Sequence, residues 1–279
     1  MDNQPRRCPL GRLWHYTGRR PSRPGFAGHL RMTGLDEVER NDKEPSMIPW
    51  SLLDTAQVPC GGGELRLMRR GTEYSIKLGQ NELMNSRLSG SEQALATIAC
   101  DRIRARKRPQ ILIGGLGMGF TLRAALAVLG AEARIIVAEL VPAVVAWARG
   151  PLAEVFGDSL TDPRVHICEA DVGHLIRGDR SSFDAILLDV DNGPEGLTRK
   201  ANDELYNGAG LSAAHVALRP GGVLAVWSSG PHPNFTRRLR KTGFDVDEVR
   251  VTAKGPQGGA RHVIWIATRA DHGRVSTRR

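Results

Sequence analysis

The chain has 279 residues, of which 39 are Lys or Arg and 30 are Asp or Glu, so its formal net charge is +9. Its length and its 41% hydrophobic content suffice for one packed α/β domain with a small additional unit, and they exclude a disordered chain. No apolar run approaches the ~18 residues that span a bilayer, and no secretory signal is evident, so we expect a cytoplasmic protein with no membrane partner.

Residues 1–46 are rich in Arg, Gly and Pro and show no helical or strand period. They contain nine basic and six acidic side chains, a net charge of +3, and the remaining residues carry +6. Because such a segment buries little apolar surface, we predict a mobile basic tail. Met47 opens the more protein-like stretch MIPWSLLDTA, and one hypothesis places the native start there.

Residues 47–89 are predicted to form a small β unit. Its short alternating runs, ELRLMRRG, TEYSIKL and NELMNSR, are separated by Gly and Asn, which is typical of antiparallel strands joined by turns. The next segment, SGSEQALATIACDRIRARKR, has apolar residues at helical spacing. Ser89 or Ser91 is its expected N-cap, and Pro109 marks its end.

Residues 90–279 are predicted to form a Rossmann-like catalytic domain in which strands and helices alternate. The expected order is QILIGG (strand), GFTLRAALAVLG (helix), ARIIVAEL (strand), PAVVAWARGPLAEVFG (helix), RVHICEA and FDAILLDV (strands), 201–218 (helix), a turn at 220–222, VLAVWSS (strand), 234–242 (helix), FDVDEVRV and RHVIWIAT (strands). Apolar strands alternating with helices specify a parallel sheet covered on both faces. The last two strands are joined by a polar loop, 252–260, without a crossover helix, so they should be antiparallel. We therefore predict a doubly wound, mostly parallel seven-stranded methyltransferase-like sheet with an antiparallel last strand.

A glycine-rich segment lies between the first of these strands and the next helix. It contains Gly114, Gly115, Gly117 and Gly119. Glycines at this point let bare main chain approach a ligand at a helix N-terminus, although many such turns use glycine for packing alone. Glu139 ends the next strand, about 20 residues further on, where a carboxylate can bind both hydroxyls of a ribose. Loop and carboxylate together predict an adenine nucleoside site, and the antiparallel ending favours an S-adenosyl ligand over NAD.

Three further aspartates follow later strands. Asp171 is placed to bind an adenine amino group or to cap the short helix after it. Asp189 and Asp191 lie at the carboxyl end of the fourth strand, where ligands bind in open α/β sheets. A carboxylate there can orient or deprotonate an amine that attacks carbon next to a sulfonium. The alternative is a pair of aspartates that cap the loop.

Over about residues 64–268, the order and spacing of these features resemble the spermidine synthase family, whose members transfer an aminopropyl group in polyamine biosynthesis. The resemblance implies that the four glycines form the nucleotide loop, that Glu139 holds the ribose and that Asp171 holds the adenine. It also implies that Asp189 is the first aspartate of the family's catalytic DxxD segment and that Glu92 contributes to binding the acceptor.

The chain departs from the family pattern on the acceptor side. Leu116, Gly117 and Met118 occupy the part of the loop where the family has an aspartate facing the donor's amine. The second aspartate of DxxD falls on Asn192 unless Asp191 takes its role. Gly90 and Ser91 stand where the family has Tyr-Gln before the helix glutamate.

Three functional hypotheses follow. The first is an aminopropyltransferase, the second a methyltransferase acting on a small molecule, and the third an inactive donor-binding protein whose basic tail binds nucleic acid. The expected co-substrate is decarboxylated S-adenosylmethionine or S-adenosylmethionine itself, and the expected partner is an amine or another small acceptor, with a homodimer as a further expectation. The four cysteines show no metal-binding spacing, so we expect no metal.

Overall fold

The computed structural model describes residues 48–190, 193–194 and 204–271. The chain divides into two compact units, 1–49 and 50–279, and the second unit contains every described helix and strand. The predicted tail, the hypothetical start at Met47 and the candidate Asp191 lie outside the described residues.

The predicted N-terminal β unit is a four-stranded antiparallel sheet in the order β1-β2-β3-β4. Its strands are β1 (Ser51–Gln57), β2 (Glu64–Arg70), β3 (Glu73–Leu78) and β4 (Asn81–Asn85), with a short helical turn, η1 (Pro59–Gly61), between β1 and β2. Alternation along β2 and β3 buries one face of this sheet, including Leu67 and Ile76. The strand β1 is additional to the three strands expected from the sequence.

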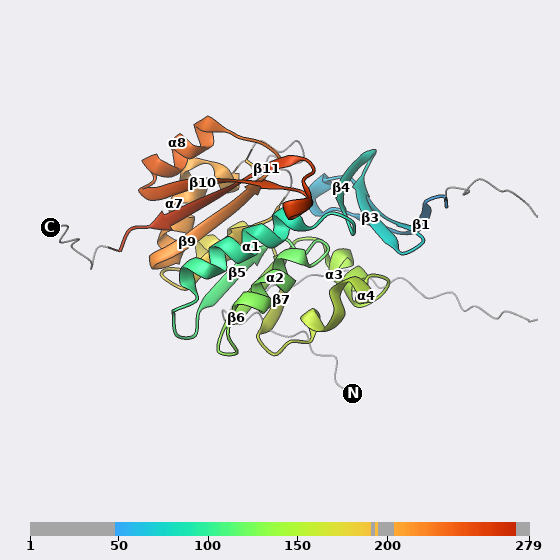
Figure 1. Cartoon of the computed structure of the whole chain (residues 1–279), viewed down its shortest axis with the longest axis horizontal. Helices are drawn as coiled ribbons and strands as arrows, with labels where there is room; N and C mark the ends of the chain where they lie inside the picture. The colour runs from blue at the N-terminus through green and yellow to red at the C-terminus, as the bar shows by residue number, and fades with distance from the viewer. Residues whose placement is uncertain (1–47, 191–192, 195–203, 272–279) are drawn as a thin grey trace, which may run out of the picture. The chain divides into compact units, whose positions relative to one another are not determined.

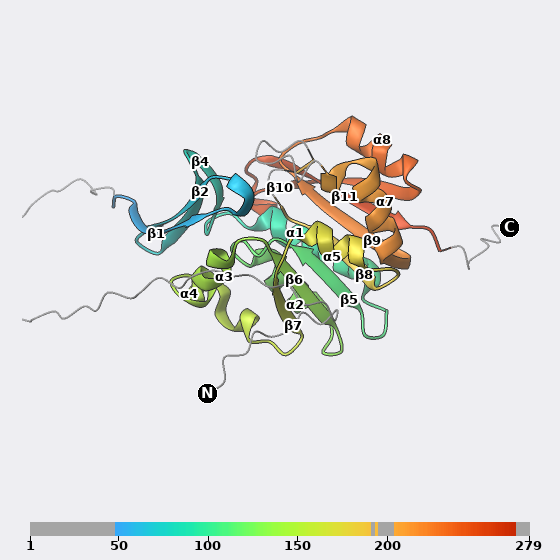
Figure 2. The same cartoon turned by 180° about the vertical axis from the view of Figure 1, so that it is seen from behind.

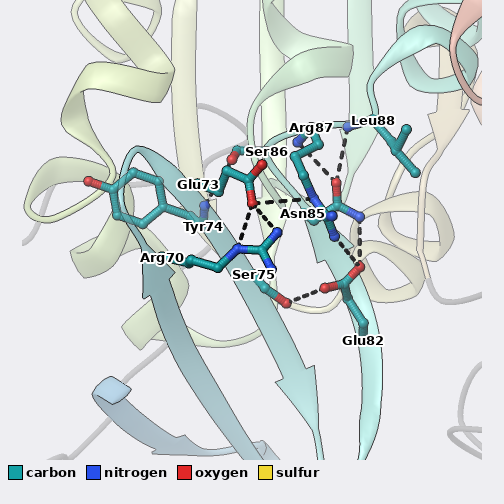
Figure 3. A network of polar contacts seen from close by, with 9 residues as sticks. All are labelled: Arg70, Glu73, Tyr74, Ser75, Glu82, Asn85, Ser86, Arg87 and Leu88. Atoms are coloured by element: carbon teal, nitrogen blue, oxygen red, sulfur yellow. Dashed lines mark hydrogen bonds and ion pairs between the residues drawn. The ribbon is translucent and has the colours of Figure 1, made fainter. Parts of the chain in front are cut away.

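A network of polar side chains fixes the end of this sheet (Figure 3). The Asn85 side-chain oxygen accepts hydrogen bonds from the main-chain N–H groups of Arg87 (2.9 Å) and Leu88 (3.0 Å). The Glu82 carboxylate accepts from the Ser75 hydroxyl (2.7 Å) and from the Asn85 amide (2.8 Å). These contacts hold Arg87 and Leu88, which lie directly before the first helix.

The larger sheet has seven strands in the order β10-β11-β9-β8-β5-β6-β7 (Figure 1). Its strands are β5 (Gln110–Gly114), β6 (Arg134–Glu139), β7 (Val165–Glu169), β8 (Phe183–Leu188), β9 (Leu218–Ser228), β10 (Phe244–Thr252) and β11 (Arg261–Arg269). The pairs from β9 to β7 are parallel, whereas β11 is antiparallel to both of its neighbours. The predicted fold class is confirmed.

Helices cover both faces of this sheet. The helices α1 (Gly90–Ile103) and α2 (Phe120–Val128) pack on each other across one face (Figure 1), and α3 (Pro142–Arg149) packs beside β6. The helices α5 (Val172–Gly178) and α7 (Gly208–Ala217) cover the opposite face (Figure 2), with α8 (Pro233–Lys241) packed on α7 and β10. Within the described residues, no helix combines the length and apolarity needed to cross a bilayer. Apolar residues of both sheets and of the helices α1 to α3 join in one core cluster.

The elements differ from the sequence expectations at four places. The helix α1 ends at Ile103, before the end expected at Pro109. The long helix predicted after β6 stops at Arg149, because Gly150 and Pro151 interrupt it, and the short α4 (Ala153–Phe156) and η2 (Gly157–Leu160) follow. The turn expected at 220–222 is an irregularity within β9, which pairs Leu218 with Phe183 and then Val223 with Ala185. The loop between β10 and β11 contains one short helical turn, η3 (Gly255–Gln257).

Candidate active site

The glycine-rich loop connects the carboxyl end of β5 to α2. Three of its glycines have left-handed main-chain conformations, with φ of +89° at Gly115, +52° at Gly117 and +75° at Gly119. A Cβ at Gly119 would lie 2.4 Å from the Phe156 ring, and one at Gly115 would lie 2.5 Å from the carbonyl oxygen of Asp189. Gly114 is likewise enclosed, by a valine and a leucine side chain. The packing of the protein itself therefore requires glycine at 115 and 119, whether or not a ligand approaches the loop.

Glu139 is the last residue of β6, and its carboxylate lies against the glycine-rich loop. It accepts hydrogen bonds from the main-chain N–H groups of Leu116 (2.9 Å) and Val141 (2.8 Å). Burial raises the pKa of Glu139, and main-chain N–H groups, those of Val141 and Leu116 first, act in the opposite direction. The structure therefore brings the loop and the carboxylate into direct contact.

Asp171 follows β7 and is the N-cap of α5. Its side chain accepts a hydrogen bond from the main-chain N–H of His174 (3.2 Å). This is the capping role that the sequence analysis named as the alternative to adenine binding. One carboxylate can do both, so the adenine contact stays a prediction.

Asp189 follows β8 at the same edge of the sheet, and its main-chain N–H binds the carbonyl oxygen of Gly114 (3.1 Å). The buried hydroxyl of Thr121, in the first turn of α2, donates to the Asp189 carboxylate (2.6 Å). Burial raises the pKa of Asp189 to about 7, the negative charge of Glu92 acts in the same direction, and the bond from Thr121 lowers it. The carboxyl can therefore exchange a proton near neutral pH.

Glu92 lies in the first turn of α1, close enough to Asp189 for the two charges to interact. The Ser91 hydroxyl donates to the Glu92 carboxylate (2.7 Å), and the Thr121 hydroxyl lies 3.5 Å from the Glu92 main-chain oxygen. Burial also raises the pKa of Glu92, against the lowering effect of the Ser91 bond. Two carboxyl groups that are 97 positions apart in the sequence are thus close enough for their charges to interact, and Thr121 contacts both residues.

Residues that the sequence analysis gave no chemical role extend this group. The Nδ1 atom of His262, near the start of β11, lies 3.0 Å from the Ser91 hydroxyl oxygen. The His262 ring packs edge-on against Trp227 of β9, with 4.8 Å between ring centroids. The Trp227 indole N–H is buried and has no hydrogen-bond partner among the described residues. The sequence signal that could have identified His262 is a histidine at the start of an otherwise apolar strand. Because this strand is antiparallel to β9, it begins at the edge of the sheet where the parallel strands end.

The strand order and the carboxylates at the carboxyl ends of β6 and β8 define the class of the protein, a methyltransferase-like α/β protein. Solved structures share this fold. A spermidine synthase from Thermotoga maritima superposes with a TM-score of 0.63 at 19% identity, covering 79% of this chain and 73% of that one. A spermidine synthase in complex with the transition-state analogue AdoDATO superposes with a TM-score of 0.62 at 18% identity over the same shares.

Sequence relatives agree with the fold. A polyamine aminopropyltransferase of Mycobacterium tuberculosis is 35% identical over 151 residues, which are 50% of this chain and 28% of the relative. Polyamine aminopropyltransferase 2 of Pseudomonas aeruginosa is 30% identical over 156 residues, 52% of this chain and 42% of that protein. The chain thus spans less than half the length of these curated relatives, and no protein-family model matches it. In sequence and in fold together, the chain is spermidine synthase-like.

Proposed function

We propose that this protein is an aminopropyltransferase of polyamine biosynthesis, which moves the aminopropyl group of decarboxylated S-adenosylmethionine to an amine. The observation that carries the proposal is the pair of carboxyl groups, Asp189 and Glu92, whose charges interact beside the glycine-rich loop and Glu139. The names of the curated relatives and the AdoDATO complex of a structural neighbour support it.

The donor site in this proposal is formed by the glycine-rich loop, Glu139 and Asp171. Main-chain N–H groups hold the Glu139 carboxylate against the loop, those of Leu116 and Val141 foremost, and in this proposal the carboxylate also accepts from the ribose hydroxyls. Asp171 keeps a second acceptor oxygen for the adenine amino group.

The reaction in this proposal is a displacement at the carbon next to the sulfonium. The lone pair of the amine nitrogen forms the new N–C bond, the C–S bond breaks, and its electron pair remains on sulfur, which leaves as the neutral thioether methylthioadenosine. The attacking amine must be uncharged, so one proton has to leave its nitrogen. Asp189, whose pKa is about 7, is suited to accept that proton near neutral pH.

One observation favours methyl transfer as a second candidate. Leu116 and Met118 of the loop are buried apolar side chains, so this part of the loop offers the donor's amine no carboxylate. A loop of this kind discriminates less strongly between S-adenosylmethionine and its decarboxylated form than the loop of the spermidine synthase pattern does.

Calorimetry with S-adenosylmethionine, its decarboxylated form and methylthioadenosine tests the donor site. We expect all three to bind, with the decarboxylated form preferred at least 10-fold, because a free carboxylate would face Asp189 and Glu92 at a charge cost on the order of 1.4 kcal/mol or more. Preference for the intact amino acid would replace the proposal with methyl transfer. Binding of none of the three would overturn both.

A transfer assay separates binding from chemistry. With decarboxylated donor and diamines as acceptors, we expect Asp189→Asn to lower kcat by roughly 10²–10⁴-fold, the usual contribution of a general base. Asp245→Asn is the matched control, because Asp245 is an exposed carboxylate at the far end of β10. Equal losses in both variants would contradict the role of Asp189.

A further inference from the structure

We propose that Glu92, Ser91 and His262 form a proton relay, which carries the proton released by the attacking amine from the carboxyl pair to the partly exposed imidazole. The inference rests on the proposed transferase function and assigns positioning and proton-transfer roles to Ser91 and His262. Ser91 is one of the positions where the chain departs from the spermidine synthase pattern.

The relay is a continuous line of short contacts. The Ser91 hydroxyl lies 2.7 Å from the Glu92 carboxylate and 3.0 Å from Nδ1 of His262. Ser91 is only 1% exposed, whereas Glu92 and His262 are both partly exposed, so a buried hydroxyl bridges the carboxylate and the imidazole. Glu92 is linked in turn to Asp189 by the interaction of their charges. Thr121 donates to the Asp189 carboxylate and approaches only the main-chain oxygen of Glu92.

The two ends of the relay are held together by main-chain packing. The main-chain N–H of Gly90 binds the carbonyl oxygen of Ala253 (2.9 Å), in the loop that leads into β11. A Cβ at Gly90 would lie 2.2 Å from the main-chain nitrogen of Gly255. Only glycine at this position lets α1 and the loop approach so closely, and this approach places Ser91 against His262.

The surroundings of His262 fix the plane of its ring. Trp227 packs edge-on against it, and Val251 is its cross-strand neighbour on β10. Burial lowers the pKa of the imidazole, so the ring is neutral at pH 7 and has one N–H and one free lone pair. Such a ring can exchange its two tautomers as a proton passes through it.

The proton count closes. With Glu92 ionised, the Ser91 hydroxyl donates to Glu92, so Nδ1 of His262 must donate to the Ser91 oxygen. When the carboxyl pair takes the amine proton and Glu92 holds it, His262 must also change tautomer: Nε2 takes a proton from solvent and Nδ1 gives one up to solvent. Glu92 then donates to Ser91, and Ser91 donates to the Nδ1 lone pair. Transfer along the line returns Glu92 to the carboxylate, and the proton on Nε2 passes to solvent.

Nitrogen NMR of the full-length protein tests the relay without any turnover. Isotope-labelled histidine, with the His262 signals identified by their loss in His262→Gln, reports which ring nitrogen carries the proton. We expect the Nδ1–H tautomer while Glu92 is ionised and a shift toward Nε2–H as Glu92 becomes protonated at lower pH. Glu92→Gln and Ser91→Ala should each abolish this change. A His262 tautomer that is indifferent to both substitutions would overturn the relay, even in an active enzyme.

Kinetics provide the second test. Ser91→Ala and His262→Ala should lower kcat on the order of 10-fold or more with little change in KM, and added imidazole should restore part of the loss in His262→Ala. His166→Gln, an exposed histidine on the edge strand β7, is the matched control. Unchanged kcat in both relay variants would overturn the relay. If the tautomer coupling is present but wild-type protein transfers no aminopropyl group, the proposed function fails while the relay stands.

Discussion

Asp189 is held in a position that suits proton transfer at the expense of stability. Its carboxyl has a pKa of about 7 in the folded protein, compared with 3.8 for an unperturbed aspartate. The causes are burial first and the charge of Glu92 second, and the single hydrogen bond from Thr121 offsets only part of them. A residue kept for packing alone would be better replaced by an uncharged one.

The cost of this arrangement is measurable as a function of pH. Between pH 3.8 and about 7, the folded protein binds more protons at Asp189 than the unfolded chain does, so the free energy of unfolding falls as pH rises through this window. A pKa difference of this size corresponds to at most about 4 kcal/mol. We therefore expect Asp189→Asn to be more resistant to urea than wild type at pH 8 and to lose this advantage toward pH 4.

Urea unfolding followed by fluorescence at pH 4, 6 and 8 measures this effect. The exposed Asp245→Asn serves again as the control and should track wild type at every pH. An Asp189→Asn advantage that does not grow with pH would show that the Asp189 carboxyl is not destabilised by its site.

At the scale of elements, the short helix α4 packs against the glycine-rich loop through the ring of Phe156. Gly119 has φ of +75°, and a Cβ there would lie 2.4 Å from the ring of Phe156, which is almost completely buried. We expect Gly119→Ala to destabilise the protein by about 2–4 kcal/mol, from the left-handed conformation and the overpacked ring together. The urea midpoint at neutral pH measures this loss.

Gly130 provides the comparison for that substitution. It follows α2, its φ is not positive, and a Cβ there would meet nothing within 4 Å. Gly130→Ala should therefore change the free energy of unfolding by no more than about 0.5 kcal/mol. Equal effects of the two substitutions would rule out the packing of Phe156 as the reason for glycine at 119.

Elements could be predicted from the sequence where burial imposes a pattern. The apolar strands β5, β6 and β8 are buried through most of their length, so their sequences identified them. The strand β1 was not identified, because nearly every one of its residues is exposed and no alternation results. The helix break at Gly150 was missed because an apolar pattern continues on both sides of it, in α3 and α4.

At the scale of the whole molecule, the predictable part of the site is the part built by neighbouring segments. Local sequence is enough to predict the strand β5, the glycines after it and Glu139 at the end of the next strand. The structure confirms their proximity through the hydrogen bond between Leu116 and Glu139. The contact between Ser91 and His262 joins residues 171 positions apart. It depends on the antiparallel entry of β11 beside β9 and on the close approach at Gly90, which no local pattern reveals.

The division of the chain yields the last prediction. All described helices and strands lie in the unit 50–279, and the core cluster is formed by residues of that unit. We propose that residues 1–46 form a separate tail, followed by a β unit to residue 89 and the catalytic domain from residue 90. A protein that begins at Met47 should then unfold within about 0.5 kcal/mol of the full chain and bind the donor equally well.

The same truncation decides whether the basic tail binds nucleic acid. The tail carries a net +3 and the rest of the chain +6, so removal of the tail leaves most of the charge surplus in place. We expect retention on immobilised duplex DNA at 50 and 200 mM salt to be weak and similar for the two proteins. Each phosphate contact adds about −0.9 to the slope of log affinity against log salt, so binding through several tail arginines would give the full chain a much steeper slope. Such a difference would support a nucleic-acid role for the tail. A large loss of stability on truncation would instead show that the tail belongs to the fold.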